Sequence, residues 1–168
     1  MADEQVKTEA LQILNVCRIL PGLIVFDLDY TLWPFYCECR SSRDKPSLYP
    51  QANGILNALK EKGVSMAIAS RTPTPSIANA FLNKLGITSL FTAMEIYPSG
   101  THKTQHFQKI QQKTGVPFKS MLFFDDENRN IEAVSNFGVT SILVGNGVNL
   151  DALKTGLRRY SGSSASQR

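Results

Sequence analysis

The sequence predicts an α/β domain in which a parallel β-sheet is covered by helices on both faces. Short, almost wholly apolar runs such as "LIVFD" at 23–27 and "MLFFDD" at 121–126 have the length and composition of strands buried on both faces. Segments with apolar residues at helical spacing lie between these runs, and several end at a glycine, as at Gly63 and Gly115. Regular alternation of strands and helices is typical of a doubly wound sheet.

The first element is a leading helix that we expect over 4–19, packed on the outside of the domain. Pro21-Gly22 ends this segment, because proline and glycine interrupt helices. Its apolar residues recur at helical spacing: Val6, Ala10, Ile13, Leu14 and Cys17.

The sheet and its covering helices follow from the same two patterns. The expected strands are 23–27, 64–70, 90–97, 121–126 and 139–145. The expected helices between them are 50–63, 74–86, 103–115 and 128–138. The irregular stretch 33–49 after the first strand is expected to form a small flap, and no insertion is long enough to fold as a cap domain.

Length and composition indicate one main domain. A chain of 168 residues with 42% hydrophobic content can bury a real core but is too short for two full domains. We expect an N-terminal helical extension at 1–20, the main domain at 21–160 and a disordered tail at 161–168, whose sequence is polar and low in complexity. Right-handed crossovers would give a Rossmann-like, three-layer domain with a five-stranded, mainly parallel sheet.

Charge and cysteine content indicate which binding partners and which cellular compartment to expect. The net charge of +4 is spread along the chain rather than clustered, which argues against a nucleic-acid partner. Three cysteines fit no disulfide framework and favour a reducing compartment. No apolar run is long enough to span a membrane, and the first residues, "MADEQVKTEA", carry acids where a targeting peptide has bases. We therefore expect a cytoplasmic protein without a membrane partner.

Polar residues follow the predicted strands at the point where each strand ends. Because the carboxyl ends of parallel strands meet at one edge of the sheet, where such sheets bind ligands, these side chains should lie close together. One acid at a strand end is equally well explained as a helix cap or a turn residue, but so many at one edge are not. The residues are Asp27, Asp29, Ser70, Asp125 and Asp126, with Lys103 at the start of the helix after the third strand.

Phosphoryl transfer is the chemistry that would use this arrangement. Mg²⁺ takes one or two carboxylates together with waters and a substrate phosphate oxygen, so Asp27 and Asp126 can share one ion. One carboxylate can then attack phosphorus, while its neighbour protonates the leaving oxygen and later takes a proton from water. The hydroxyl of Ser70 and the ammonium of Lys103 would hold the phosphoryl oxygens as charge develops. A bound cation would therefore explain why two aspartates lie one residue apart.

Four segments resemble the motifs of a known superfamily. "VFDLDYT" at 25–31, "AIAS" ending at Ser70, Lys103 and "FFDDENRN" at 123–130 are similar, in this order, to the four motifs of the haloacid dehalogenase superfamily. The resemblance covers about residues 22–150. Within the superfamily, "VFDLDYTLWPF", "ASRT", "EIYP" and "MLFFDDENRNI" resemble the capless, acid-phosphatase-like magnesium-dependent phosphatases.

The resemblance implies a Mg²⁺-dependent phosphomonoester phosphatase that works through an aspartyl-phosphate intermediate. Asp27 would be the nucleophile and a metal ligand, and Asp29 the general acid/base with its backbone carbonyl on the metal. The fourth motif would supply Asp126 as a ligand, with Asp125 as an alternative ligand or a neighbour of the site. Asn130 stands where the superfamily often has another acid. Substrate contacts are implied for Leu28, Thr31, Ser70, Arg71 and Lys103, of which Lys103 is also catalytic.

The substrate stays open at this point. A small phosphorylated substrate such as a sugar phosphate or fructosamine 6-phosphate, or phosphotyrosine on a protein, would suit an uncapped site. The alternatives are a phosphomutase, which normally needs a lid, and a phosphate-accepting signalling or binding domain without turnover. Receiver domains carry the phosphorylated aspartate at a later strand end, where this chain has Ser70. The sequence makes no prediction of oligomeric state.

The aromatic and basic residues after the first strand, and the two histidines, are further residues near the predicted site. Trp33, Phe35 and Tyr36 would form either an aromatic wall for the substrate or core packing beneath the flap. The basic residues at 40, 43 and 45 would contact extra negative charge on the substrate. His102 and His106 are expected on the surface or at a helix start rather than on a metal.

Overall fold

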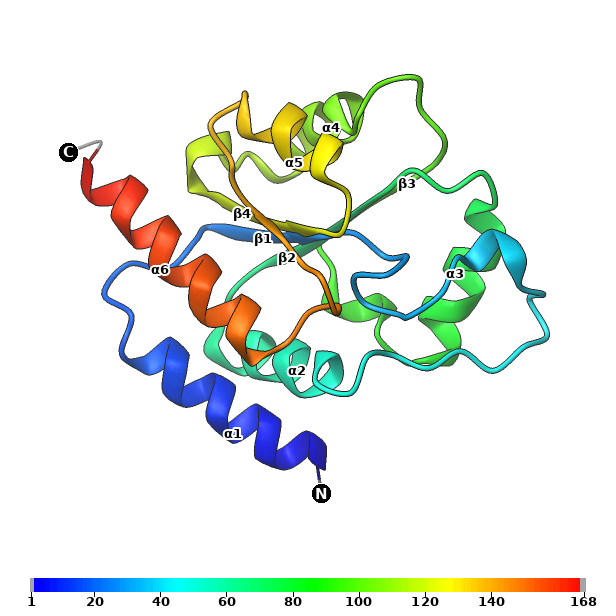
Figure 1. Ribbon diagram of the computed structural model, residues 1–168, viewed down its shortest axis with the longest axis horizontal. Coiled ribbons are helices and arrows are strands. Elements are labelled where there is room, and N and C mark those ends of the chain that lie inside the picture. Colours follow the sequence, from blue (N-terminus) through cyan, green and yellow to red (C-terminus); the bar gives the residue numbers. More distant parts are fainter. Residues whose placement is uncertain (1, 167–168) are drawn as a thin grey trace.

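The computed structural model describes residues 2–166, which form the predicted parallel sheet (Figure 1). The strands are β1 (Leu23–Phe26), β2 (Met66–Ser70), β3 (Ala93–Ile96), β4 (Met121–Asp125) and β5 (Thr140–Leu143). Their order in the sheet is β3-β2-β1-β4-β5, and every neighbouring pair is parallel. The doubly wound fold is confirmed, and β1 lies at the centre of the sheet, where the chain reverses its direction of winding.

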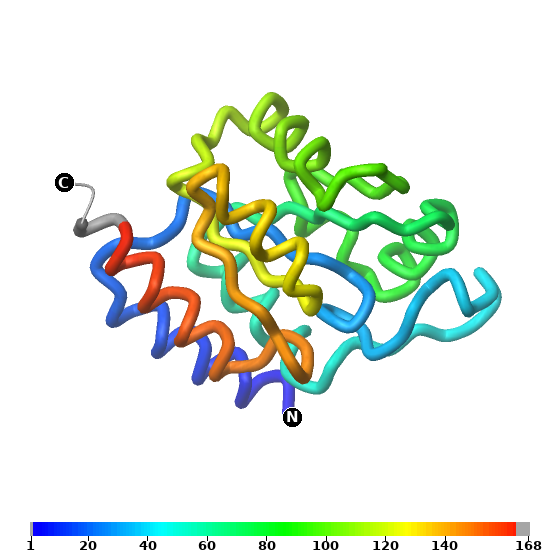
Figure 2. The backbone as a smooth tube through the Cα atoms, turned by 45° about the horizontal axis from the view of Figure 1, so that its top comes forward, coloured from blue at the N-terminus to red at the C-terminus, as the bar shows by residue number. Residues whose placement is uncertain are grey.

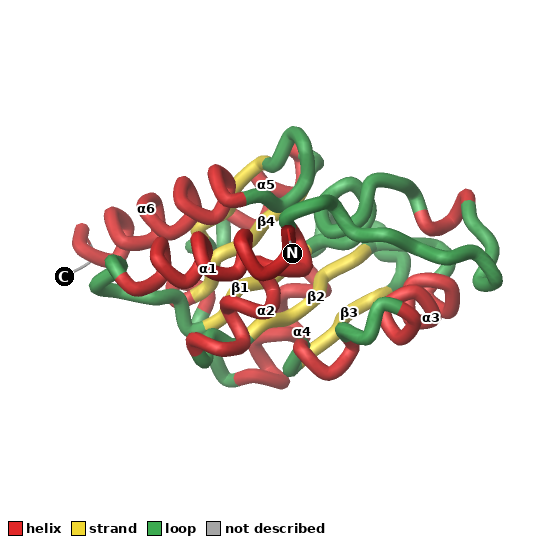
Figure 3. Tube along the Cα trace, turned by 90° about the horizontal axis from the view of Figure 1, so that it is seen from below, coloured by secondary structure: helices red, strands yellow, loops and turns green. Residues whose placement is uncertain are grey.

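Helices cover both faces of the sheet, as Figures 1 and 3 show. Alternate residues of β1 divide between two cores, Ile24 and Phe26 on one side and Leu23 and Val25 on the other. The first core is covered by α2, α3 and α6, and the second by α4 and α5. The helices are α1 (Ala2–Asn15), α2 (Ala52–Lys62), α3 (Pro75–Lys84), α4 (Thr104–Thr114), α5 (Asn128–Ser135) and α6 (Leu150–Ser166).

The strands are shorter than the apolar runs that predicted them. In the run at 90–97, Leu90 is the last residue of a short 3-10 turn, Thr88–Leu90, and β3 begins only at Ala93. The run at 64–70 enters the sheet only at Met66. These flanking residues are apolar because they pack against the core before the chain joins the ladder; Val64 and Phe91 are both buried. None of the described helices is long and apolar enough to cross a membrane.

Helix α1 forms an outer layer beside α2 and α6 (Figure 2). Val6, Ala10 and Leu14 on one of its faces are buried and belong to the larger core, as the helical spacing predicted. The contact with α2 is close at Gly54, because a Cβ atom there would lie 2.8 Å from both the carbonyl oxygen of Asp3 and the Cβ of Val6. Glycine at this position allows the two helices to pack closely.

Helix α6 was missed by the sequence prediction, and the structure extends it to Ser166, into the stretch 161–168 that we expected to be a disordered tail. Leu153, Leu157 and Tyr160 recur at helical spacing and are buried, so tertiary packing anchors the helix. The polar end continues this anchored helix to Ser166, and the Ser161 hydroxyl donates a hydrogen bond to the carbonyl of Ile19 (3.4 Å). Residues 167 and 168 lie outside the described part of the chain.

The flap after β1 is small and carries no separate cap domain within the described residues. It contains one short 3-10 helix, Cys37–Cys39. Its far end is fastened to α3, because the ammonium of Lys84 donates hydrogen bonds to the carbonyl oxygens of Ser42 and Asp44. The flap is therefore held against the body of the domain.

We predict that Gly54→Ala destabilises the protein, whereas Gly162→Ala in α6 does not. Alanine is intrinsically favoured over glycine in a helix by up to about 1 kcal/mol, and a Cβ at Gly162 would meet nothing within 4 Å. At Gly54 the clash with α1 should outweigh this gain and cost about 1–3 kcal/mol. Urea unfolding of the two variants measures the difference, and equal stabilities would show that α1 does not pack closely on α2.

Candidate active site

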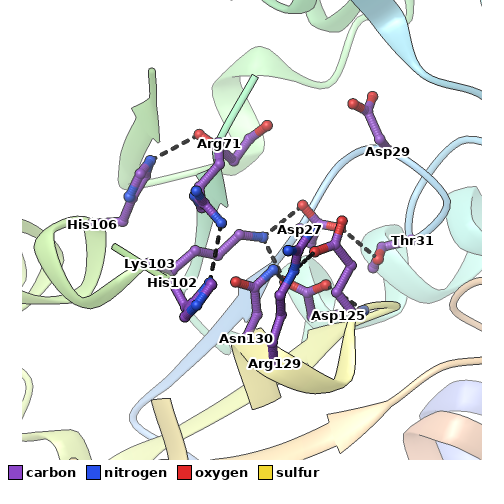
Figure 4. A network of polar contacts seen from close by, with 12 residues as sticks. Asp27, Asp29, Thr31, Arg71, His102, Lys103, His106, Asp125, Arg129 and Asn130 are labelled. Carbon is purple, nitrogen blue, oxygen red and sulfur yellow. Dashed lines mark hydrogen bonds and ion pairs between the residues drawn. The ribbon is translucent and has the colours of Figure 1, made fainter. Parts of the chain in front are cut away.

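The predicted site residues meet at the carboxyl edge of the sheet around a polar cleft (Figure 4). The cleft has a volume of about 200 Å³. Among its lining residues are those that the sequence singled out: Asp27, Asp29, Ser70, Arg71, Lys103 and Asp126. Others were not predicted to contact it: Glu38, Thr72, Pro73, Glu127, Arg129 and Asn130.

Asp27 lies on the floor of the cleft, directly after β1. Only 6% of the residue is exposed. One carboxylate oxygen, Oδ1, accepts a hydrogen bond from the ammonium of Lys103 at 2.7 Å, and the other, Oδ2, accepts one from the hydroxyl of Thr31 at 2.9 Å. Both oxygens of Asp27 are therefore fixed in direction by neighbours, and Thr31 acts on the site through Asp27.

Lys103 is buried and connects two strand ends. Its Nζ lies 2.7 Å from Asp27 Oδ1 after β1 and 2.5 Å from Asp125 Oδ2 at the end of β4. The residue precedes α4 in the left-handed conformation, with φ of 69°, which typically costs about 1–2 kcal/mol for a residue other than glycine. The two buried ion pairs explain why the backbone holds this conformation.

The two aspartates of the fourth motif face different surroundings. Asp125 is fully buried and accepts hydrogen bonds from Lys103, from Asn130 Nδ2 (3.2 Å) and from the backbone N–H of Glu127 (2.9 Å). Asp126 is partly exposed and lines the cleft, whereas Asp125 does not. At the place where the superfamily often has another acid, Asn130 donates a hydrogen bond to Asp125 and supplies no carboxylate.

The carboxylates of Asp27, Asp125 and Asp126 form the one group of three or more potential metal ligands found in residues 2–166. One oxygen from each lies within 4.8 Å of the others. An all-oxygen set of carboxylates suits Mg²⁺, which is a hard cation. Asp27 and Asp126 open to the cleft, so these two fit a Mg²⁺ that also keeps waters and a phosphate oxygen.

Burial raises the pKa of each of these carboxyl groups. The pKa of Asp27 rises to about 7 because burial outweighs the opposing pull of Lys103, and nearby Asp126 raises it further. Burial raises the pKa of Asp126 and that of Asp125 to about 6. Burial alone would lower the pKa of Lys103, but Asp125 and Asp27 together raise it, so its ammonium stays charged. Without a cation the cluster therefore holds protons near neutral pH.

Ser70 and Arg71 stand where β2 enters the cleft. Ser70 is 2% exposed. The guanidinium of Arg71 donates to the carbonyl of Ser99 (2.8 Å) and lies 3.4 Å from Nδ1 of His102, while its buried Nε has no partner among the described residues. Arg71 therefore lines the cleft with its guanidinium held in place by Ser99.

Leu28 differs from the other predicted substrate contacts. Its side chain is fully buried and does not line the cleft. Its carbonyl accepts hydrogen bonds from the backbone of Thr31 and Leu32. Any contact between Leu28 and a phosphate would therefore come from its backbone N–H.

Asp29 lies on the flap side of the cleft, apart from Asp27 (Figure 4). Its Oδ1 accepts hydrogen bonds from the indole Nε1 of Trp33 at 2.7 Å and from the backbone N–H of Cys37 at 3.0 Å. The two aspartates of the first motif therefore face different parts of the cleft. A phosphorylated substrate could be approached from both sides.

The structure separates the aromatic and basic residues of the flap. Trp33 and Phe35 are core residues, whereas Tyr36 is 45% exposed and lines the cleft, so both interpretations of this group hold for different members. The basic residues at 40, 43 and 45 are absent from the cleft lining; Arg40 instead lies over the ring of Phe35 at 4.2 Å. Arg129, on α5, supplies a cation at the cleft that the sequence analysis missed.

His106 lies at a helix start, which is one of the two places that the sequence analysis expected, but its burial was not foreseen. It is in the first turn of α4 and is fully buried. Its Nε2 lies 2.9 Å from the carbonyl oxygens of both Ser70 and Tyr97. Since both partners are acceptors, Nε2 carries the proton and links the ends of β2 and β3 to the helix that follows Lys103. The spacing of His106 from Phe107 and Ile110 on one face of the helix was the available signal.

Comparisons with known proteins agree with this geometry. The model of the acid phosphatase family matches residues 19–46 and 42–163. Human magnesium-dependent phosphatase 1 is 45% identical to the chain over 156 residues, covering 84% of this chain and 88% of the human protein. The chain belongs to the magnesium-dependent acid phosphatase family of the haloacid dehalogenase superfamily. A haloacid dehalogenase-like hydrolase superfamily protein of Schizosaccharomyces pombe is 33% identical, covering 71% of this chain and 83% of its own length.

Membership in this family fixes the reaction class and the cofactor. The protein is a magnesium-dependent phosphatase, and Mg²⁺ is its cofactor. A superfamily hydrolase from Ehrlichia chaffeensis shares the fold with a TM-score of 0.66 at 13% identity, covering 84% of this chain and 98% of that one. The CbbY protein of Rhodobacter sphaeroides, solved with phosphate, gives a TM-score of 0.62 at 13% identity, covering 83% of this chain and all of that one.

We predict that Mg²⁺ raises the melting temperature more at about pH 8 than at about pH 5.5. The folded pKa values of Asp27 and Asp126 lie above the usual value near 4, so in the metal-free protein their contribution to stability is present at acid pH and lost as pH rises to about 7. Mg²⁺ needs the ionised carboxylates and must displace protons at the lower pH.

Thermal melts with excess Mg²⁺ and with chelator, at both pH values, measure this difference. The control variant is Asp126→Asn, in which the shift caused by Mg²⁺ should shrink at both pH values. A shift of the same size at both pH values in the unmodified protein would contradict the assignment of these carboxylates as the metal site.

Proposed function

We propose that this phosphatase hydrolyses phosphomonoesters in two steps, with Asp27 as the nucleophile that becomes phosphorylated. The observation that carries the proposal is the position of Asp27, a nearly buried carboxylate on the floor of the cleft whose two oxygens are held by Lys103 and Thr31. A nucleophile needs a fixed direction of attack, and these two hydrogen bonds supply it. The roles of the neighbouring residues follow from where they lie.

Lys103 and Ser70 line the cleft together with Asp27, so their ammonium and hydroxyl groups can donate to the phosphoryl oxygens of a bound substrate. Fixed donors of this kind stabilise charge as it develops in the transition state. Arg71, held by Ser99, adds a guanidinium beside them. Asp125 does not reach the cleft, and its contribution is to keep Lys103 charged and in place.

We assign Asp27 and Asp126 as the side-chain ligands of Mg²⁺, with the backbone carbonyl of Asp29 implied by the family resemblance. When bound there, Mg²⁺ offsets the negative charge that gathers between the carboxylates and the phosphate. Asp29, across the cleft, donates a proton to the leaving oxygen and then accepts one from the water that hydrolyses the phosphorylated Asp27.

Small polyhydroxylated esters such as sugar phosphates are the substrates that the cleft favours. Apart from Tyr36 and Pro73, its lining is polar or charged, and it includes the exposed Glu38 and Arg129. Such groups suit hydroxyls better than an extended apolar surface. A phosphomutase is disfavoured because no cap domain is present among the described residues to keep water from the intermediate, and a domain without turnover would not need Asp29 in the cleft.

Tyrosine phosphate on a protein surface is a second candidate substrate. The cleft is open and Tyr36 exposes an aromatic ring at its edge, with its partner Tyr30 in an edge-to-face contact at 4.7 Å. An aryl leaving group could stack on this ring. A phosphorylated protein would reach the site because only a small flap stands beside it.

We predict that Asp27→Asn abolishes turnover while the fold is retained, because the amide fills the same space but cannot attack phosphorus. Asp29→Asn should slow the reaction by about 10²- to 10⁴-fold, the range for lost general acid–base catalysis. Steady-state hydrolysis of phenyl phosphate, whose leaving group needs a proton donor, and thermal melts measure both variants. Borohydride quenching during turnover should convert position 27 to homoserine, which mass spectrometry detects. Substantial activity of a folded Asp27→Asn variant would rule out Asp27 as the nucleophile.

We predict that Tyr36→Ala raises KM for a phosphotyrosine peptide by about three- to tenfold, since an aromatic contact contributes about 0.5–1.5 kcal/mol. KM for a hexose 6-phosphate should change less than twofold. Tyr36→Phe keeps the ring and serves as the matched control, with a KM close to that of the unmodified protein for both esters. If Tyr36→Ala changed both KM values equally, Tyr36 would not discriminate between the two substrate classes.

A further inference from the structure

The acid/base Asp29 is held by the root of the flap rather than by the metal cluster. Its Oδ1 accepts hydrogen bonds from Trp33 Nε1 at 2.7 Å and from the Cys37 backbone N–H at 3.0 Å. Both donors come from the first residues of the flap, four and eight positions after Asp29. The backbone also forms an isolated bridge between Asp29 and Trp33, so the two residues are joined through main chain and side chain.

Trp33 is a rigid donor. Its side chain is fully buried, stacks on Phe35 at 5.4 Å between ring centroids, and meets the edge of Phe81 at 5.8 Å. A buried indole N–H needs an acceptor, because leaving it unpaired costs about 1–3 kcal/mol. Asp29 is the acceptor that the described residues provide. The packing of Trp33 in the core therefore fixes where Asp29 Oδ1 lies.

The direction in which Asp29 is held matches the geometry of phosphoryl transfer. In such a reaction the attacking and leaving oxygens lie roughly in line on opposite sides of phosphorus. Asp27 attacks from the floor of the cleft, so the leaving oxygen departs toward the flap. Asp29 lines the same cleft and stands apart from Asp27 on the flap side (Figure 4).

We propose that Trp33 is a positioning residue whose indole N–H, together with the Cys37 N–H, aims the carboxyl group of Asp29 at the leaving-group oxygen. This inference rests on the proposed function, in which Asp29 protonates that oxygen. Trp33 touches neither the substrate nor Asp27 and acts only through Asp29. The first residues of the flap therefore belong to the catalytic apparatus, while its outer part is fastened to α3 by Lys84.

The test uses the fact that Trp33 is the single tryptophan of the chain. Replacing tryptophan biosynthetically by β-(3-benzothienyl)alanine exchanges the N–H for sulfur at this one position and preserves the shape of the ring. The readout is kcat/KM for phenyl phosphate and for p-nitrophenyl phosphate. These esters are similar in shape, but the phenolate of the first is the poorer leaving group and depends more on a proton donor.

We expect kcat/KM for phenyl phosphate to fall by about 10²-fold, the typical cost of a misplaced catalytic group. The value for p-nitrophenyl phosphate should fall much less. The ratio of kcat/KM for p-nitrophenyl phosphate to kcat/KM for phenyl phosphate should therefore rise by about tenfold or more. Trp33→Phe should change the ratio in the same direction. Phe81→Leu, which disturbs the packing of Trp33 but not its N–H, is the matched control and should leave the ratio unchanged.

Equal falls for both esters in the benzothienyl protein, or an unchanged ratio, would overturn the proposal. A rise in the ratio for Phe81→Leu as large as that for the benzothienyl protein would do the same, since packing alone would then explain the effect.

A spectroscopic measurement separates this proposal from the proposed function. Excitation moves electron density of an indole away from its nitrogen, so a carboxylate beside Nε1 stabilises the excited state. We expect Asp29→Ala to shift the Trp33 emission to shorter wavelength, whether or not the protein turns over substrate. An unchanged spectrum would overturn the contact. Absence of activity toward either ester in the unmodified protein would overturn the proposed function, and with it the catalytic role of the contact.

Discussion

A buried ammonium between two buried carboxylates is the interaction on which the rest of the site depends. Lys103 Nζ joins Asp27 after β1 to Asp125 at the end of β4. Removing one member of such a group leaves an uncompensated charge away from water, which typically costs about 3–5 kcal/mol. The α4 start must therefore remain beside the centre of the sheet. The backbone of Lys103 adopts the left-handed conformation because its side chain must reach both carboxylates.

Two kinds of support converge on the cleft from opposite sides. The floor is electrostatic: Lys103, Thr31 and Asn130 fix the carboxylates of Asp27 and Asp125 through short polar contacts. The flap side is built from packing, because Trp33 is held by aromatic neighbours and in turn holds Asp29. This division suits the two tasks that we propose for Asp27 and Asp29. A nucleophile and a metal need charge balance, whereas an acid that serves a departing group needs a fixed direction.

The parts of the fold that follow from local pattern were predictable from the sequence. Buried parallel strands are continuous apolar runs, and their carboxyl ends share one edge of the sheet. The sequence alone therefore predicted that Asp27, Ser70 and Asp126 lie close together. Helix α6 was missed because its end is rich in serine and glycine, and only burial of Leu153 and Leu157 shows what anchors it. The role of His106 depends on two carbonyl oxygens from different strands, and no sequence spacing encodes that meeting. Arg129 lines the cleft and the basic residues of the flap do not, and this difference depends on the path of the flap, which local sequence does not reveal.

The bond between Lys84 and the carbonyls of the flap has a consequence for how substrates exchange. Because the far end of the flap is fastened to α3, the proposed function implies that an ester enters and phosphate leaves without a large opening of the flap. On the proposed function, selectivity would then come from cleft-lining side chains such as Tyr36 and Glu38, not from closure of a loop around the substrate. On the function we propose, a change of substrate preference then needs only a single substitution beside the cleft, because no moving lid has to be redesigned with it.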